Sequence, residues 1–341
     1  MPIVLITGGS GFLGTYLTER FLADGHTVRI LDVLPPEKVS TGVEFIRGDV
    51  RDSEIVAKAS AGANVIVHNA ALVPLSKSGD AFRDVNVRGT SVMLKAAIDA
   101  KINKFIFVSS SSVYGVPNNS DPITEETAQN PFEAYGISKA EAETLCQNAK
   151  DALDVSIIRP RTILGPGRMG LMSLLFDWVE TNHRIYILGN GNNRYQLVAA
   201  EDVAEAVSLA SRLPCRGQDF NVGADRFGTL REDLEQFCRA VGNKSKIVGV
   251  PSWLARATLP ILGLLRLSPL VSYQYRIADK TVYFSTEKLK TILSFTPKYS
   301  NSEMLTRAYR WYKDHPTDPN SASLHRKKMN AGILRLLKYV P

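Results

Sequence analysis

Short β-rich apolar runs alternate with longer helical stretches through the first half of the chain. The apolar runs are nearly continuous, which is typical of parallel strands buried on both faces. The stretches between them have the residue spacing of helices. This pattern predicts strands at Ile3–Thr7, Thr27–Asp32, Val43–Ile46, Val65–His68, Lys104–Ser109 and Val155–Arg159, and helices at Gly14–Asp24, Asp84–Ala100 and Pro131–Lys150.

Alternating strands and helices predict a parallel sheet that is covered by helices on both faces. Because crossovers between parallel strands are right-handed, the predicted fold is α/β, a Rossmann-type doubly wound parallel sheet. We expect residues 1–160 to form this domain, with some later segments returning to it.

The regular alternation of strands and helices ends at about residue 160. Glycine and proline cluster at Gly165–Gly170, and the later runs are fewer and more widely spaced. We therefore expect residues 161–315 to form a smaller C-terminal substrate-binding lobe, not a second independent domain. In this region the pattern predicts strands at Arg184–Leu188 and Asp219–Val222, and helices at Glu201–Ser211 and Leu230–Val241.

Composition adds that the chain is an ordinary globular protein, with 341 residues of which 44% are hydrophobic and 22% charged. Its three cysteines have no paired spacing, which favours reduced thiols in a cytoplasmic protein, and no metal site is expected. The first apolar run lacks the features of a signal peptide. The longest apolar stretch, Trp253–Leu267, is interrupted by polar residues and is too short to span a bilayer.

The net charge of +7 is concentrated at the C-terminus, where residues 316–341 form a basic amphipathic tail. Apolar residues recur among its basic ones at roughly helical spacing, so one interpretation is a helix that contacts an anionic membrane surface peripherally. A terminal helix that docks on its own domain or on a partner subunit explains the pattern as well. Because no nucleic-acid-binding motif accompanies the basic residues, we expect no nucleic-acid partner.

A glycine-rich turn follows the first strand and has the spacing Gly-x-x-Gly-x-x-Gly. Such a turn lets the backbone approach a pyrophosphate closely, and the N-terminus of the following helix favours an anion. An acid ends the second strand, 18 residues after the last of these glycines, where it can bind the adenosine ribose and repel a 2′-phosphate. The sequence therefore predicts NAD, not NADP, bound by Gly8, Gly11, Phe12, Leu13, Gly14 and Asp32.

Tyr135 and Lys139 are four residues apart in a predicted helix and therefore share one face. The fifth strand runs into Ser109–Gly115, which places hydroxyl groups at the sheet edge where doubly wound folds bind ligands. Oxidation of an alcohol needs a base that removes the hydroxyl proton as hydride leaves the carbon. Free tyrosine, with a pKa of about 10, is ionised too little, but a nearby ammonium and a positive nicotinamide would lower that pKa.

Together these motifs resemble those of the extended short-chain dehydrogenases, the NAD-dependent epimerase/dehydratase family. The resemblance extends more weakly to about Asp314. Its motifs are specific for the family and less so for the substrate. In chain order they are Thr7–Gly14, Asp32, Gly48–Val50, His68–Ala71, Asn86–Thr90, Ser109–Gly115, Tyr135–Lys139 and Arg159–Pro160.

The resemblance implies a role for each matching position. Ser110 is implied as the catalytic serine, Tyr135 as the general acid/base, and Lys139 as the residue that binds nicotinamide-ribose hydroxyls and lowers the tyrosine pKa. The family also pairs the two predicted helices at 84–100 and 131–150 between subunits, which implies a homodimer. Other implied roles are flanking the adenine for Asp49 and Val50, lining the dinucleotide path for Ala70 and Ala71, and supporting the active-site helix for Asn86.

Two serines bear on the type of reaction. Family members that dehydrate or decarboxylate sugars usually carry an acid in the two positions after the catalytic serine or threonine. Here those positions are Ser111 and Ser112, which would contact substrate, so a 4,6-dehydratase is disfavoured. Our first hypothesis is a nucleotide-sugar epimerase acting at C4 through a keto intermediate. Its candidate substrate-binding arginines are Arg161, Arg194 and Arg276, the last two for phosphates.

Two departures from the epimerase pattern keep an alternative open. The family's phosphate arginine usually lies one residue later, where this chain has Tyr195, and the asparagine that follows the sixth strand is replaced by Arg161. Arg159–Gly167 also resembles the 3β-hydroxysteroid dehydrogenase-like branch, and the apolar segment 251–271 could cover a hydrophobic alcohol. A non-catalytic NAD-binding protein is a third hypothesis, which the presence of Ser110, Tyr135 and Lys139 disfavours.

Overall fold

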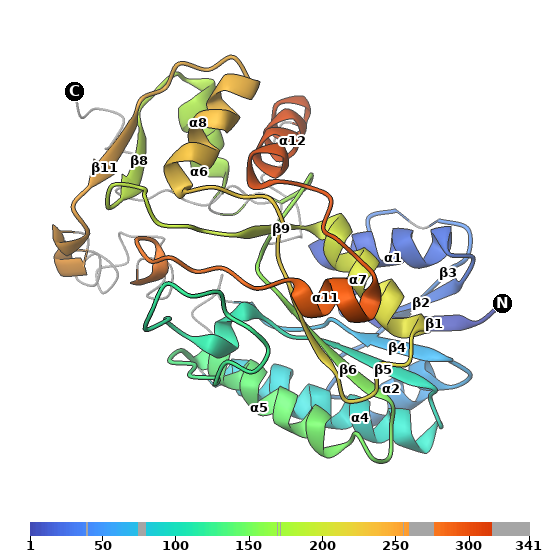
Figure 1. The fold of residues 1–341 in the computed structure, drawn as a ribbon. Helices are drawn as coiled ribbons and strands as arrows, with labels where there is room; N and C mark the ends of the chain where they lie inside the picture. The colour runs from blue at the N-terminus through green and yellow to red at the C-terminus, as the bar shows by residue number, and fades with distance from the viewer. Residues whose placement is uncertain are drawn as a thin grey trace.

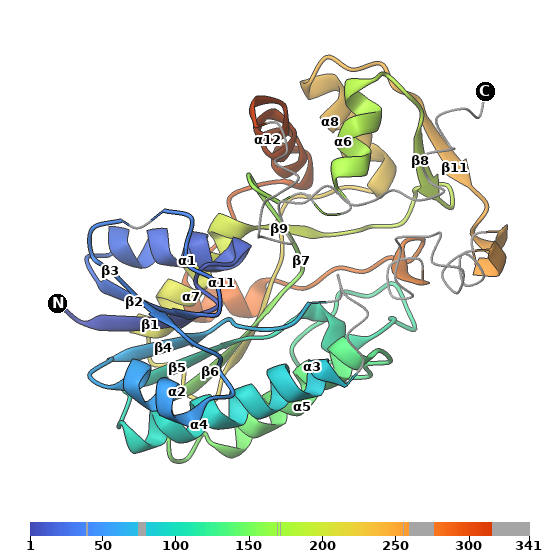
Figure 2. The same cartoon turned by 180° about the vertical axis from the view of Figure 1, so that it is seen from behind.

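The structure is a computed structural model that describes residues 1–38, 40–73, 80–168, 170, 172–254, 256–258 and 276–315. A larger part is built around one sheet, and a smaller lobe containing α6, α8 and α12 lies on one side of it (Figures 1 and 2). The basic tail at 316–341 and residues 259–271 of the apolar segment lie outside the described residues, so the interpretations of these segments stay predictions.

The larger part contains a seven-stranded sheet with the strand order β10-β6-β5-β4-β1-β2-β3. All neighbouring strands are parallel, which confirms the predicted Rossmann-type fold. The chain order reverses on either side of β1, so the crevice at the carboxyl ends of β1 and β4 is the place where such sheets bind ligands. The strands are β1 (Ile3–Thr7), β2 (Thr27–Asp32), β3 (Val43–Arg47), β4 (Val65–His68), β5 (Lys104–Val108), β6 (Val155–Pro160) and β10 (Asp219–Val222).

Helices cover both faces of this sheet (Figure 1). Side chains alternate along each strand, so Val4 and Ile6 of β1 join one core cluster while Leu5 joins the other. Burial of both faces explains why these strands are continuous apolar runs in the sequence. The first layer contains α1 (Phe12–Ala23), α7 (Ala200–Arg212) and α11 (Glu287–Leu293); the second contains α2 (Ser53–Ser60), α4 (Gly89–Asp99) and α5 (Ala134–Asn148).

The helix predicted over 84–100 differs from a single α-helix in the structure. It comprises α3 (Ala81–Arg83), a π-helical segment η1 (Asp84–Arg88) and α4. Such π-turns within helices are rare and are frequent at functional sites. This one places Asn86 in the buried interior, within hydrogen-bond distance of Ser138 on α5.

The smaller lobe has a core of its own, formed by α6 (Met172–Glu180), α8 (Leu230–Ala240) and α12 (Asn301–Asp314). Residues of the predicted strand at 219–222 instead pair with β6, so this segment returns to the main sheet. No helix among the described residues has the length and apolar character needed to cross a membrane. Two small parallel pairs complete the lobe: β7 (Thr162–Leu164) with β9 (Leu197–Ala199), and β8 (Ile185–Leu188) with β11 (Ile247–Val250).

Candidate active site

The glycine turn between β1 and α1 has no room for side chains at two of its positions. Gly8 has a φ of +67°, and a Cβ there would lie 2.8 Å from the Cα of Ala70. A Cβ on Gly14 would lie 2.2 Å from the carbonyl oxygen of Gly8. Gly11 is the N-cap of α1, so no side chain at that position accepts hydrogen bonds from the helix N–H groups, and the first turn of the helix has no acid. Its N–H groups therefore favour an anion, so the turn fits a pyrophosphate.

Asp32 lies at the carboxyl end of β2, beside this turn. Its carboxylate accepts hydrogen bonds from the backbone N–H groups of Ser10 and Leu34, both at 3.1 Å. Burial raises the pKa of Asp32, and these backbone donors lower it. The donors fix the position of a carboxylate that still has oxygen lone pairs for the hydroxyls of a ribose.

A buried hydrogen-bond chain joins β1 to the π-helical segment through His68. The hydroxyl of Thr7 lies 2.8 Å from Nδ1 of His68 and accepts the N–H groups of residues 69 and 70. Nε2 of His68 lies 3.1 Å from the Thr90 hydroxyl, which donates to the carbonyl oxygen of Asn86. Because the Thr90 proton is already used, Nε2 carries the imidazole proton and Nδ1 accepts one from Thr7. Burial lowers the pKa of His68 to about 3, so the ring is neutral.

Asn86 extends this series of hydrogen bonds to α5. Its side-chain oxygen accepts the N–H of Leu72 at 2.8 Å, and its amide nitrogen donates to the Ser138 hydroxyl at 3.0 Å. Ser138 in turn donates to the carbonyl oxygen of Tyr135 at 2.7 Å. The structure thus places Asn86 where it supports the first turn of α5.

Lys139 lies on α5, one turn beyond Tyr135, with its side chain buried. Its Nζ donates to the carbonyl oxygen of Val108 at 2.6 Å and lies 4.1 Å from the ring centre of Phe107. Burial lowers the pKa of Lys139 to about 8, and Glu143 opposes that change. The phenol ring of Tyr135 packs edge-on against Phe82 at 6.0 Å. Since an ammonium has three N–H groups, Lys139 can still donate to a ligand.

The serine segment after β5 packs against the start of α5. Ser110 caps the short 3₁₀-helix η2 (Ser111–Tyr114), and its Oγ lies 3.2 Å from the Oγ of Ser112. A Cβ on Gly136 would lie 2.7 Å from the carbonyl oxygen of Ser112, so the two backbones approach closely. The structure therefore brings Ser110, Tyr135 and Lys139 to one region at the carboxyl edge of the sheet.

The residues assigned to the adenine side already have partners in the protein. Asp49 accepts hydrogen bonds from the guanidinium of Arg51, at 2.6 and 2.9 Å, and Arg51 also pairs with Asp84. The Arg51 hydrogen bonds lower the pKa of Asp49. Val50 is buried against Gly89, where a Cβ would lie 2.7 Å from a Val50 methyl carbon. An adenine would thus meet a preformed ion pair here.

The three candidate substrate arginines lie in different surroundings. The guanidinium of Arg276 lies 5.3 Å from the ring centre of Phe132, which is two residues before the start of α5. Arg161 is buried and donates to two backbone carbonyl oxygens, at 3.2 and 3.3 Å. Arg194 stacks at 4.6 and 4.5 Å over two aromatic rings of the lobe. Of the three, only Arg276 contacts the segment that leads into α5, and the substrate role of all three stays a prediction.

One residue near the site was missed by the sequence analysis. Arg168 lies in the glycine-rich segment after β7, and its guanidinium lies 5.3 Å from the ring centre of Phe12, the first residue of α1. The hydroxyl of Tyr16 donates to the carbonyl oxygen of Pro166 at 2.7 Å, which ties this loop to α1. Burial lowers the pKa of Arg168 to about 10, and Tyr135 interacts with it electrostatically. The glycine cluster signalled the loop, but not that its arginine faces the site.

Comparison with known proteins agrees with this arrangement. The family described as the NAD dependent epimerase/dehydratase family matches residues 4–223, which is more than half of the chain. The matched region includes the whole glycine turn, the serine segment and the catalytic helix.

Individual relatives differ in their described activities. The chain is 38% identical to "Uncharacterized protein y4nG" of Sinorhizobium fredii, over 98% of this chain and 85% of that protein. It is 30% identical to the UDP-glucose 4-epimerase of Mycolicibacterium smegmatis, over 83% of this chain and 98% of the relative. It is 26% identical to the mouse sterol-4-alpha-carboxylate 3-dehydrogenase, decarboxylating, over 89% of this chain and 88% of the relative.

Solved structures share the fold. The UDP-glucose 4-epimerase of Thermotoga maritima, solved with UDP-glucose, has a TM-score of 0.76, covering 92% of this chain and 99% of that one. The two sequences are 22% identical, so this likeness concerns the fold.

Proposed function

The chain belongs to the NAD dependent epimerase/dehydratase family, and we propose that it is a nucleotide-sugar epimerase acting at C4. Members of this family are NAD-dependent enzymes of the extended short-chain dehydrogenase/reductase type, and NAD is their cofactor. The observation that supports the proposal is the site itself: a phenol and a buried ammonium on one helix face, packed against a segment whose side chains are hydroxyls.

The residues of the chain have distinct tasks in this proposal. NAD held over the glycine turn would supply reversible hydride transfer at C4 of the sugar. Tyr135 takes the proton of the C4 hydroxyl, Lys139 keeps the phenol acidic enough to do so, and Ser110 holds the oxygen. After the keto sugar has turned over in the site, Tyr135 returns the proton to the oxygen on the other face. Protons and electrons therefore balance within one cycle.

Ser111 and Ser112 favour this reaction over elimination. Loss of water from a sugar is assisted by an acid beside the catalytic serine. The two positions carry hydroxyls here, and the 30% identity to an epimerase extends over nearly the whole length of that relative.

The experiment that tests the proposal uses the purified protein without added NAD. It is incubated with UDP-glucose and with other UDP- and dTDP-sugars, and the C4 epimers are separated by chromatography. We expect epimer formation with no accumulation of NADH. Stoichiometric NADH release with a sugar, or no epimer from any of them, would overturn the proposed reaction.

A second candidate is a dehydrogenase for a hydrophobic alcohol of the 3β-hydroxysteroid type. It is favoured by the similarity to the mouse sterol dehydrogenase and by Trp253, whose side chain is 71% exposed at the start of a short helix. Because an exposed tryptophan is suited to contact apolar ligands or membranes, the region near it fits such a substrate. Absorbance at the NADH band after mixing the protein with NAD and a 3β-hydroxysteroid distinguishes this candidate from the first.

We also propose that the enzyme is a cytoplasmic homodimer. A groove of about 320 Å³ lies between α4 and α5 and is lined mainly by apolar surface. Ile98 and Leu145 contribute to it from the two helices. A second copy that packs its own α4 and α5 against this groove would bury these side chains.

A further inference from the structure

A buried carboxylate lies one helical turn beyond the catalytic lysine. Tyr135, Lys139 and Glu143 are spaced four residues apart along α5, so their side chains follow one face of the helix. Lys139 and Glu143 are each 2% exposed. The mechanism above uses the first two residues and gives no role to Glu143.

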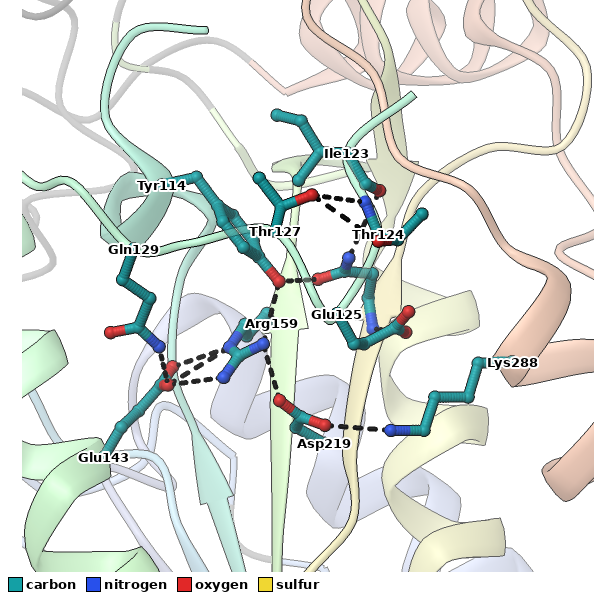
Figure 3. A network of polar contacts seen from close by, with 11 residues as sticks. Tyr114, Ile123, Thr124, Glu125, Thr127, Gln129, Glu143, Arg159, Asp219 and Lys288 are labelled. Atoms are coloured by element: carbon teal, nitrogen blue, oxygen red, sulfur yellow. Dashed lines mark hydrogen bonds and ion pairs between the residues drawn. The ribbon is translucent and has the colours of Figure 1, made fainter. Parts of the chain in front are cut away.

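Three donated hydrogen bonds to Glu143 from Arg159 and one from Gln129 fix its carboxylate (Figure 3). Arg159 Nε lies 3.0 Å from Oε1, and Arg159 Nη2 lies 2.7 Å from Oε2. Gln129 Nε2 lies 2.6 Å from the same Oε2. A carboxylate held in this way keeps its orientation when the neighbouring site binds or releases a ligand.

Arg159 also contacts groups other than Glu143. Its Nη1 lies 2.7 Å from Oδ2 of Asp219 on β10 and 2.8 Å from the hydroxyl of Tyr114 (Figure 3). Asp219 also pairs with Lys288 at 2.9 Å. Since the guanidinium charge is shared between two carboxylates, Glu143 retains negative potential toward Lys139.

The other titratable groups around Lys139 are uncharged. His68 on β4 is neutral because burial lowers its pKa to about 3. Cys146 on α5 remains a thiol because burial raises its pKa. From β5, Lys139 meets a carbonyl oxygen and the ring of Phe107. Glu143 and Cys146 both raise the pKa of Lys139, Glu143 more strongly, and of the two only Glu143 is an ionised acid because Cys146 remains a thiol.

We propose that Glu143 is a positioning residue that acts through Lys139: its fixed carboxylate keeps the lysine in the ammonium form inside a site from which water is excluded. An ammonium in such a site is otherwise disfavoured by its lost hydration. The inference rests on the role proposed for Lys139, but not on which alcohol the enzyme oxidises.

The sign of the expected change follows from the charge. Removing the carboxylate in Glu143→Gln removes a group that raises the pKa of Lys139, so the lysine loses its proton at lower pH. The lysine is needed as a cation, so the alkaline loss of activity also moves to lower pH. The glutamine keeps the size of the side chain and an oxygen that can accept from Arg159.

The test is an NMR titration of the protein labelled with ¹³C at the lysine Cε, without substrate. The Lys139 signal is identified by its absence from Lys139→Met. We expect wild type to titrate near pH 8, and Glu143→Gln to titrate lower by at least about one pH unit, the lower range for an opposite charge nearby.

Asp219→Asn is the matched control, because it also removes a carboxylate from Arg159 but lies on β10, not on the face of α5 that carries Lys139. We expect Asp219→Asn to lower the Lys139 pKa by less than Glu143→Gln does, because the Glu143 carboxylate stays in place although Arg159 then neutralises more of its charge. Glu143→Asp keeps the charge, so we expect it to titrate closer to wild type than Glu143→Gln. Equal shifts in Glu143→Gln and Asp219→Asn, or none in either, would overturn the inference. Because the titration needs no substrate, it stands apart from the failure of any sugar to react.

Discussion

At the scale of single residues, the site depends on atoms that are absent as much as on those that are present. A Cβ added at Gly8 or Gly14 would collide with backbone atoms. Glycine at these positions therefore allows the tight turn that leaves room for a pyrophosphate. Burial lowers the pKa of both Lys139 and His68. Only for Lys139 does a nearby carboxylate, that of Glu143 on the same helix, oppose this change. The pKa of Lys139 falls from 10.5 to about 8, whereas that of His68 falls from 6.5 to about 3, so at neutral pH the lysine is charged and the histidine is neutral.

The assigned base leads to a first prediction. Tyr135→Phe removes one hydroxyl from a ring that packs against Phe82, so the fold and NAD binding should be retained. We expect turnover to fall by at least about a hundredfold, the lower range for general acid–base catalysis. Steady-state kinetics with the sugar that the proposed incubation identifies as a substrate measure this loss. A variant with unchanged turnover would remove Tyr135 from the mechanism.

A second prediction concerns the glycine turn. In Gly14→Ala the added Cβ would lie 2.2 Å from the Gly8 carbonyl oxygen and 2.6 Å from the Cα of Gly9, all within one turn that cannot easily give way. We expect NAD to bind at least about tenfold more weakly, a loss of about 1.4 kcal/mol, in isothermal titration calorimetry. Thr15→Ala is the control, because Thr15 is the next residue of α1 and is exposed. Equal losses in both variants would contradict this explanation.

The candidate site could be predicted from the sequence only where its residues belong to local motifs. The turn, Asp32 and the Tyr135–Lys139 pair all depend on short spacings next to one strand or within one helix. Arg168 and Arg159 were not assigned such contacts, because their partners Phe12 and Asp219 lie far from them in the chain. Only folding brings those side chains together.

At the scale of elements, the strands that could be predicted are those whose own sequence shows an apolar pattern. The strands β1, β5 and β6, which the pattern predicted, are buried almost throughout, which makes each a nearly continuous apolar run. β7 and β9 have three residues each, too few to show a period. The π-helical turn at 84–88 has no signal in the spacing of apolar residues, since the chain on both sides is helical.

The buried hydrogen-bond chain through His68 connects β1, β4 and this π-helical turn, and it leads to a prediction about stability. The pKa of His68 is about 3 in the folded protein and 6.5 in its ordinary state. A histidine with a lowered folded pKa binds fewer protons when folded, so stability falls as pH decreases from 6.5 toward 3.

We therefore expect His68→Asn to be less stable than wild type at pH 7.5 but to lose less stability between pH 6.5 and pH 5. Urea unfolding at each pH measures the free energy of unfolding. His315→Asn, at an exposed histidine beyond α12, is the control and should show the wild-type slope. If His68→Asn and wild type lose stability in parallel, the neutral state assigned to His68 is wrong.

At the scale of the whole molecule, the two helix layers that cover the sheet differ in their contacts with the rest of the chain. The α1 and α7 layer meets the smaller lobe through the loop at 165–168, which Tyr16 ties to α1. In the α4 and α5 layer, α5 carries Tyr135 and Lys139, and the groove lined by Ile98 and Leu145 lies between the two helices. A second copy on that groove would therefore stiffen the element that carries Tyr135 and Lys139.

This arrangement gives the last prediction, for Ile98→Glu. Ile98 is 39% exposed in the groove between α4 and α5, and a carboxylate there would lose its hydration when a second copy packs on it. We expect wild type to be a dimer in light scattering after size exclusion, and Ile98→Glu to be a monomer that still binds NAD. Ile292→Glu is the matched control, since Ile292 is also 39% exposed but lies on α11, in the other layer. A monomeric wild type, or dissociation by both variants alike, would place the interface elsewhere.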